Sequence, residues 1–179
     1  MIRLSHGLIV LAGAAALAGM MLTQPDYGRA TRPFVSQAGA GDWAETRLFR
    51  ARLDGWRSAD RVALADGRAL DSAGVFLIVD MTIAGQGVST TADALWIGAS
   101  GRRYAATRRV ADLPRQVVGQ WFQPGLDSRA TALFELPPDE IAGGTLMLTR
   151  YPEAPLDGTL RLDALPGMPA HRAIESLGP

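Results

Sequence analysis

The residue types that carry most enzyme chemistry are scarce in this chain. Cysteine and lysine are absent, which removes thiolate nucleophiles, Schiff-base chemistry and the lysine of a phosphate loop. The two histidines are His6, in an apolar leader, and His171, near the C-terminus, and neither is expected beside a core carboxylate. A Ser–His–Asp arrangement therefore lacks its base. The sequence predicts no enzyme, no cofactor and no metal site.

Two short motifs resemble catalytic loops but lack a required residue. Residues 98–102 (GASGR) would need glycine in place of Arg102 to form a nucleophile elbow, and they do not lead from a strand into a helix. Residues 85–90 (GQGVST) lack the third glycine of a dinucleotide-binding loop. Both segments are expected to be turns between strands.

Carboxylates need a separate test, because a glycosidase requires only two of them. Asp80 lies within a long strand-like run, Asp93 begins another, and Glu135 precedes Pro137. We expect Asp80 to face outward or to pair with an arginine. A carboxylate-based hydrolase acting on envelope glycan remains the alternative function.

Arginines and aromatic residues form the candidate contact surface. Between Gly98 and Arg129, six arginines face only Asp112 and Asp127; the six are Arg102, Arg103, Arg108, Arg109, Arg115 and Arg129. Such a surface is either a solvated sheet face or a contact for anionic headgroups or an acidic partner. The residues predicted to contact a partner are Trp121, Phe122, Arg102, Arg103, Arg108 and Arg109.

Composition limits the classes of partner and of anchor. Acidic and basic residues both number 18, so the 179-residue chain has no net charge and no basic excess for nucleic acid. All basic residues are arginine and asparagine is also absent, which is typical of a GC-rich genome and is not a sign of RNA binding. Without cysteine, the domain has no disulfide and no lipid-bearing residue of a bacterial lipoprotein.

Residues 1–23 have the layout of a signal sequence, in which Arg3 precedes an apolar run from Leu8 to Leu22. Uncleaved, the segment is a signal anchor at the short end of the length of a transmembrane helix. Cleavage after Ala16-Leu17-Ala18 would release a mature chain starting at Gly19. We predict the uncleaved form: a single-pass protein of the cytoplasmic membrane with its N-terminus inside and its globular domain in the periplasm.

Turn residues divide the rest of the chain into a linker (24–41), a globular domain (42–163) and a disordered tail (164–179). The clearest strand is Val75–Ala84, whose continuous apolar start indicates a central strand covered on both faces. Asp93–Gly98 and Arg103–Thr107 are predicted to form a hairpin. Further strands are expected at 46–54, 61–64, 130–136, 145–150 and 159–162.

Seven or eight short strands without an amphipathic helix predict an all-β fold, a two-sheet β-sandwich. Ile78, Trp96, Phe134 and Leu148 are expected to share its core. The order of elements also resembles the bacterial immunoglobulin-like domains of the DUF4352 type. The long strand, the hairpin, Pro124-Gly125, residues 132–137 (ALFELP) and Leu146-Met147-Leu148 carry this resemblance. It implies the fold and a place in exported or membrane-anchored proteins, and no catalytic residues.

The sequence thus predicts a non-enzymatic binding or accessory module of the bacterial cell envelope. The membrane is contacted through the N-terminal helix, and the expected partner is another envelope protein and not nucleic acid. A secreted soluble domain, released by cleavage of the leader, is a further alternative.

Overall fold

The computed structural model describes residues 2–23, 34–64, 67–110, 113–150 and 158–177. The chain divides into two compact units, Met1–Arg32 and Pro33–Pro179. The predicted linker residues 24–33 and the acidic residues Asp66, Asp112, Glu153 and Asp157 lie outside the described residues.

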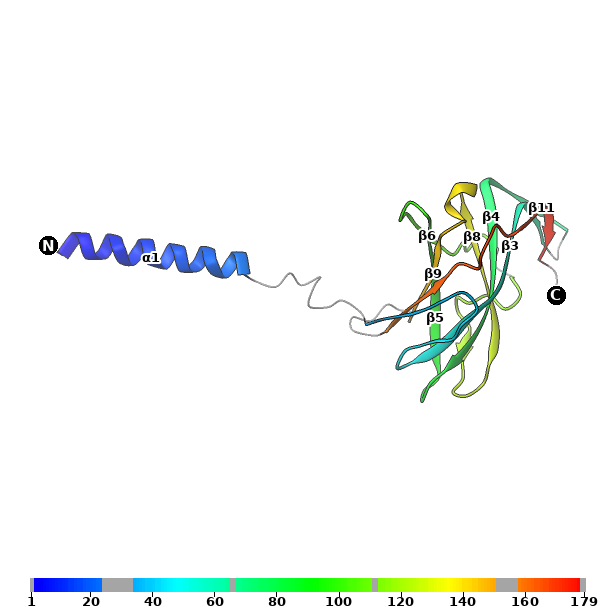
Figure 1. The fold of residues 1–179 in the computed structure, drawn as a ribbon, viewed down its shortest axis with the longest axis horizontal. Coiled ribbons are helices and arrows are strands. Elements are labelled where there is room, and N and C mark those ends of the chain that lie inside the picture. Colours follow the sequence, from blue (N-terminus) through cyan, green and yellow to red (C-terminus); the bar gives the residue numbers. More distant parts are fainter. Residues whose placement is uncertain (1, 24–33, 65–66, 111–112, 151–157, 178–179) are drawn as a thin grey trace. The chain divides into compact units, whose positions relative to one another are not determined.

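The first unit contains one helix, α1 (Ile2–Thr23), drawn in blue in Figure 1. Its side chains from Gly7 to Thr23 are exposed, including Leu11 and Leu22. The Thr23 hydroxyl donates to the Gly19 carbonyl over 2.7 Å, which satisfies one acceptor of the last turn. Among the residues that the structure describes, no helix has the length and apolarity needed to cross a membrane, so the predicted transmembrane segment is not supported.

The second unit is built from two sheets. The first sheet has the order β1-β10-β9-β5-β6, with β7 paired to β5. Its strands are β1 (Val35–Ala38), β5 (Thr90–Ile97), β6 (Arg103–Ala105), β7 (Trp121–Phe122), β9 (Thr145–Arg150) and β10 (Thr159–Asp163). The predicted hairpin is present: Leu95 pairs with Ala105 in β5 and β6, and Gly101 has the positive φ that the turn requires.

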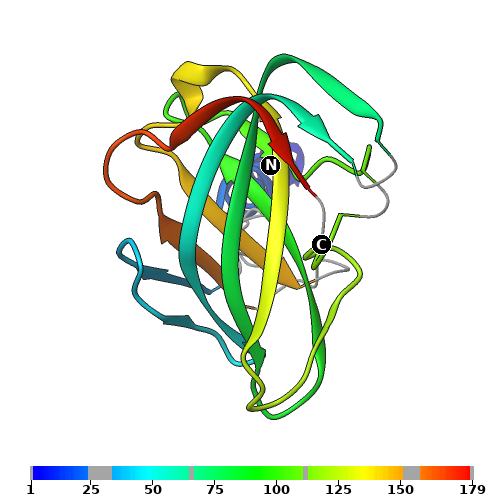
Figure 2. The same cartoon turned by 90° about the vertical axis from the view of Figure 1, so that its right-hand side faces the viewer.

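The second sheet has the order β11-β3-β4-β8, with β2 paired to β3. Its strands are β2 (Ala44–Glu45), β3 (Phe49–Ala63), β4 (Ala69–Gly85), β8 (Ser128–Leu136) and β11 (Ala170–Ser176). Figure 2 shows β3, β4 and β8 running side by side as long curved strands. A short 3₁₀-helix, η1 (Pro138–Glu140), follows β8.

The core lies between the two sheets, and it confirms the predicted two-sheet sandwich. Alternate residues of β4 (Val75, Leu77, Val79, Met81 and Ile83) face Trp96, Leu146, Leu148 and Leu160 of the first sheet. Trp96 stacks at a tilt on Phe134, with 6.2 Å between the ring centroids. Trp96, Phe134 and Leu148 therefore share one core, as predicted.

Ile78 belongs to a second apolar cluster, on the opposite face of the same sheet. There it packs with Phe76, Val62, Leu133, Val110, Leu113 and Leu177. The prediction that Ile78 lies in the sandwich core is therefore wrong, because its position in β4 has the parity opposite to that of Leu77 and Val79. The same cluster confirms that β4 is covered on both faces over its apolar start.

The structure also changes the boundaries of the domain. The predicted tail contains β11, which pairs in parallel with β3 from Ala170 to Ser176, so the tail is not disordered. The predicted linker contains β1, which pairs in parallel with β10. Both strands are held by backbone hydrogen bonds to distant segments, which local composition cannot reveal. Two predicted strands, 46–54 and 61–64, are parts of the single strand β3.

The core assignment predicts a large stability difference between two single substitutions. Phe134→Ala removes a fully buried ring and leaves a cavity, so we expect a loss of about 3–5 kcal/mol in the free energy of unfolding. Arg108→Ala removes an exposed side chain 3.9 Å from Asp93, and we expect a change within about 0.5 kcal/mol. Urea denaturation of both variants measures the difference. Equal stabilities for the wild type and Phe134→Ala would contradict the packing described.

Candidate functional site

A polar concavity lies on the outer face of the second sheet, the face turned away from the sandwich core. We call it the outer-face groove; its volume is about 840 Å³. Strands β3, β4 and β8 form its floor, the loop around Pro114 forms one wall, and the end of β11 forms another. The lining residues are Arg52, Asp54, Gly55, Arg57, Asp80, Met81, Thr82, Leu113, Pro114, Arg115, Arg129, Ala130, Thr131, Ser176 and Leu177.

Strand register brings the floor residues together. Asp80 lies opposite Gly55 in β3 and Thr131 in β8, while Thr82 lies opposite Arg52 and Arg129. Because side chains alternate along a strand, these residues share the face opposite to Met81 and Val79. An irregularity in β3 between Leu53 and Gly55 places the additional residue Asp54 at this face.

Asp80 is the centre of one hydrogen-bonded group. It pairs with the Arg57 guanidinium and accepts a hydrogen bond from the Thr131 hydroxyl over 2.8 Å. Arg57 also pairs with Glu175 of β11 over 2.7 Å, and Arg172 contacts the same carboxylate. Asp80 therefore faces outward and serves as the partner of an arginine, which confirms the expectation from its strand position.

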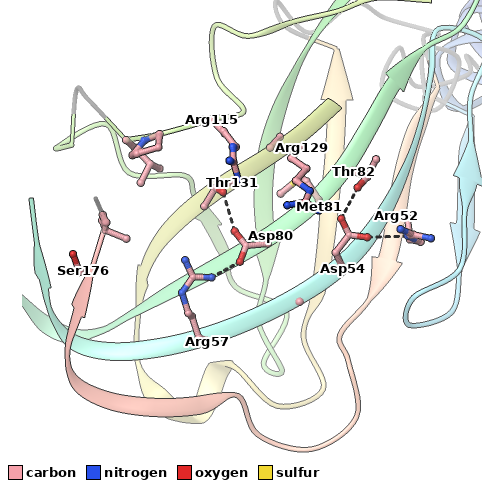
Figure 3. Close-up of a pocket in the computed structure, with 15 residues that line it drawn as sticks. Arg52, Asp54, Arg57, Asp80, Met81, Thr82, Arg115, Arg129, Thr131 and Ser176 are labelled. Atoms are coloured by element: carbon pink, nitrogen blue, oxygen red, sulfur yellow. Dashed lines mark hydrogen bonds and ion pairs between the residues drawn. The ribbon is translucent and has the colours of Figure 1, made fainter. Parts of the chain in front are cut away.

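Asp54 is the centre of a neighbouring group. It accepts a hydrogen bond from Arg52 over 2.8 Å and one from the Thr82 hydroxyl over 2.5 Å. In Figure 3, Arg57, Asp80, Thr131 and Arg115 lie toward one end of the groove and Arg52, Asp54 and Thr82 toward the other, with Arg129 drawn between the two groups. Both floor carboxylates are thus held by arginines.

The residues predicted to contact a partner do not form one surface. Trp121, in β7, is 64% exposed, but its neighbour Phe122 is fully buried in the core, so Phe122 cannot touch a partner. Arg102 and Arg103 are exposed at the tip and start of the β5–β6 hairpin. Arg109 pairs with Glu135 over 2.7 Å, and Arg108 lies near Asp93.

The sequence alone identified only some of the groove residues as candidates. Arg115 and Arg129 belong to the arginine-rich stretch, but sequence spacing alone does not separate them from Arg102 or Arg108. Arg52, Asp54 and Arg57 were missed, because strand β3 alternates poorly and carries an irregularity. The contribution of β11 to the wall was missed with the strand itself.

His171 lies in a position that the sequence analysis did not foresee. Parallel pairing of β11 with β3 sets it beside Ser58. Its Nδ1 is 3.1 Å from the Ser58 hydroxyl and its Nε2 is 3.3 Å from an Asp60 carboxylate oxygen. His171 thus does have a serine and a carboxylate beside it, but Asp60 is an exposed surface residue and not a core carboxylate. However, Ser58 is only 3% exposed, so its hydroxyl is closed to a substrate and these contacts fasten the edge strand.

Glu140, in η1, is a buried carboxylate that contacts the turn of the β5–β6 hairpin. It accepts hydrogen bonds from the Ser100 hydroxyl over 2.6 Å and from the Ser100 backbone N–H over 3.0 Å. These two bonds, aided by the charge of Arg102, hold the pKa of Glu140 below its usual range. A Cβ at Gly98 would overlap this carboxylate, so the turn needs glycine there. Ser100 thus belongs to a structural clamp, consistent with the predicted hairpin turn.

The fold and groove define a β-sandwich with a polar, arginine-lined outer face. No family model matches the chain, including any for the DUF4352 type, and no curated protein matches it. Solved structures do resemble it. The yjhA protein of Bacillus subtilis shares 12% identity over 70% of this chain and 99% of that protein, with a TM-score of 0.51.

Two further structures have lower scores. A conserved hypothetical protein of Bacillus anthracis shares 11% identity over 66% of this chain and 93% of that protein, with a TM-score of 0.47. An uncharacterized β-sandwich protein of Clostridium difficile shares 8% identity over 77% of this chain and 99% of that protein, with a TM-score of 0.44. The likeness to the yjhA protein supports the β-sandwich fold alone.

The Glu140 clamp predicts a pH-dependent stability. Because its pKa is lower in the folded than in the unfolded chain, the carboxylate stabilises the fold above about pH 4.3. That contribution is lost as the pH falls through the lowered folded-state value. Glu140→Gln should therefore be less stable than the wild type at pH 7, and the difference should shrink at pH 3. Urea denaturation at both pH values measures it, with the exposed neighbour Asp139→Asn as the charge-matched control. A difference that stays constant with pH would contradict the clamp.

Proposed function

We propose that this chain is a non-enzymatic binding or accessory module of the bacterial cell envelope, with the β-sandwich outside the cytoplasm and the outer-face groove as its ligand-contacting surface. The observation that carries the proposal is the pairing of an exposed apolar helix with a separate β-sandwich unit. Apolar side chains such as Leu8, Ile9 and Leu17 are unfavourable in water, so the helix requires an apolar environment. Export machinery and a membrane both provide one.

The groove supports a binding role more than a catalytic one. Its two carboxylates each pair with an arginine, so both are already engaged within the protein. Arginine forks, in contrast, are well suited to bind a negatively charged group. The exposed Trp121 and the hairpin residues Arg102 and Arg103 are further, separate points of contact for another envelope protein.

The finer family assignment is also part of this proposal. We propose that the domain is immunoglobulin-like and of the DUF4352 type, on the strength of the order of its strands. The two-sheet core with Trp96 between the sheets supports this assignment. The described residues form eleven strands, more than the seven or eight expected, and the additional strands include β1 and β11, which pair in parallel at the sheet edges.

Membrane attachment through α1 gives the first test. We expect the full chain to stay in the membrane fraction after high-salt and carbonate washing, while a variant lacking residues 2–23 is recovered in the soluble fraction. An alkaline phosphatase fused after Pro179 should be active, since that enzyme matures only outside the cytoplasm. A soluble form that starts at Gly19 would show cleavage of the leader and a secreted domain. An inactive fusion would contradict the extracytoplasmic location.

Two carboxylates in one groove favour the alternative, a hydrolase of envelope glycan, enough to require its own test. We expect purified protein to release no reducing sugar from isolated cell-wall glycan, and Asp80→Ala to leave any hydrolytic activity of the protein unchanged. The reason is that the Asp80 carboxylate already pairs with Arg57 and accepts a hydrogen bond from the Thr131 hydroxyl. Glycan hydrolysis that disappears in Asp80→Ala or Asp54→Ala would establish the hydrolase instead, with Asp139→Ala as the control.

A further inference from the structure

We propose that the outer-face groove binds a phosphate group carried by a polyol, held between the guanidinium groups of Arg115 and Arg129. The inference deepens the proposed binding function, because it names the class of ligand, and it rests on that function. The shared chemistry is a phosphate ester, whether it comes from a phospholipid headgroup or from a soluble phosphate.

Among the described residues, two of the arginines that line the groove form ion pairs and two do not. Arg52 pairs with Asp54, and Arg57 pairs with Asp80 and with Glu175. Among the described residues, neither Arg115 nor Arg129 has a carboxylate within ion-pair distance; Asp127, the acid nearest in sequence to Arg129, pairs with Arg50 over 2.9 Å. Even with Glu175 counted, four arginines face three acids, so the groove keeps a positive excess at Arg115 and Arg129.

Backbone contacts set these two arginines side by side. The Thr131 N–H donates to the Arg115 carbonyl over 2.7 Å, and the Val117 N–H donates to the Thr131 carbonyl over 3.0 Å. These bonds fasten the loop to β8 at Thr131. Arg129 is two residues away on the same face of β8, about 7 Å along the strand. Both residues line the groove, and they come from two different elements.

The backbone of Arg115 shows that its placement is imposed. Its φ of 57° lies in the left-handed region that favours glycine, and no other non-glycine residue in the described part of the chain adopts it. The two hydrogen bonds with Thr131 hold the loop in this conformation. Arg115 thus places a long, charged side chain in the groove lining, at a position whose backbone conformation favours glycine.

The geometry favours phosphate over carboxylate. A single guanidinium fork satisfies both oxygens of a planar carboxylate, whereas a tetrahedral phosphate presents oxygens to two forks on different elements. The volume of about 840 Å³ exceeds that of a lone ion and leaves room for an attached polyol. The hydroxyl-bearing Ser176 and the ion-paired floor offer polar contacts for its hydroxyl groups, and Leu113 and Leu177 line the apolar side.

Calorimetric titration of the full chain in a nonionic detergent tests the proposal with two probes, inorganic phosphate and glycerophosphoglycerol. We expect the wild type to bind at least one probe, with an affinity that falls as sodium chloride is raised. The double variant Arg115→Gln/Arg129→Gln should bind at least about tenfold more weakly, because two charge-assisted contacts are removed. The single variant Arg129→Gln should show an intermediate loss.

A matched double variant, Arg68→Gln/Arg150→Gln, removes the same charge outside the groove lining and should bind like the wild type. Thermal melting of all variants checks that each is folded; Arg129→Gln serves as the readout if the double variant is not. Binding of inorganic phosphate alone indicates a soluble phosphate, and stronger binding of glycerophosphoglycerol indicates a lipid headgroup. The proposal is overturned if neither probe binds, or if the groove variants bind as tightly as the control.

This experiment separates the inference from the proposed function. Phosphate binding by a protein whose phosphatase fusion is inactive would refute the envelope location and leave the groove assignment standing. An active fusion without binding of either probe would refute the groove assignment and leave the accessory module standing.

Discussion

Burial of the inner face of β4 against the first sheet is the constraint on which the rest of the structure depends. Five alternate residues of this strand pack on Trp96 and on the leucines of β9 and β10. With no disulfide in the chain, this contact and its neighbours must supply the stability of the domain. The strand is therefore fixed in register on both sides, by β3 and by β8, since a shift of one residue would turn its apolar set toward solvent.

The register of β4 also sets which of its residues lie on the opposite face of the sheet. Near the start of the strand, Phe76 and Ile78 are apolar there and are covered by Val110, Leu113 and Leu177. Further along β4, Asp80 and Thr82 lie on the same face as Phe76 and Ile78. There the covering apolar side chains end and the outer-face groove begins. The groove is thus the continuation of a packed face into polar positions.

Buried or half-buried acids in this domain serve different purposes. Glu140 holds the hairpin turn through Ser100, and Glu175 joins β11 to Arg57. Asp80 and Asp54 bind arginine and threonine side chains at the groove floor. Burying a carboxylate is costly unless it is hydrogen-bonded, and each of these groups is. Arg115 and Arg129 differ from these networks, because their guanidinium groups have no such acid among the described residues.

Local pattern in the sequence determined the β-sandwich class, the central strand at 75–84 and the β5–β6 hairpin, because alternation and turn residues act between near neighbours. It also indicated that Asp80 would pair with an arginine. Only the tertiary structure decided that β1 and β11 join the sheets, that His171 lies beside Ser58, that Phe122 is buried and that Ile78 packs outside the sandwich core. It alone assembled the groove from β3, β4, β8, β11 and the loop at 113–115. The physical reason is that parallel edge pairing and cross-strand register join residues far apart in the chain, through backbone bonds that leave no local pattern in the sequence.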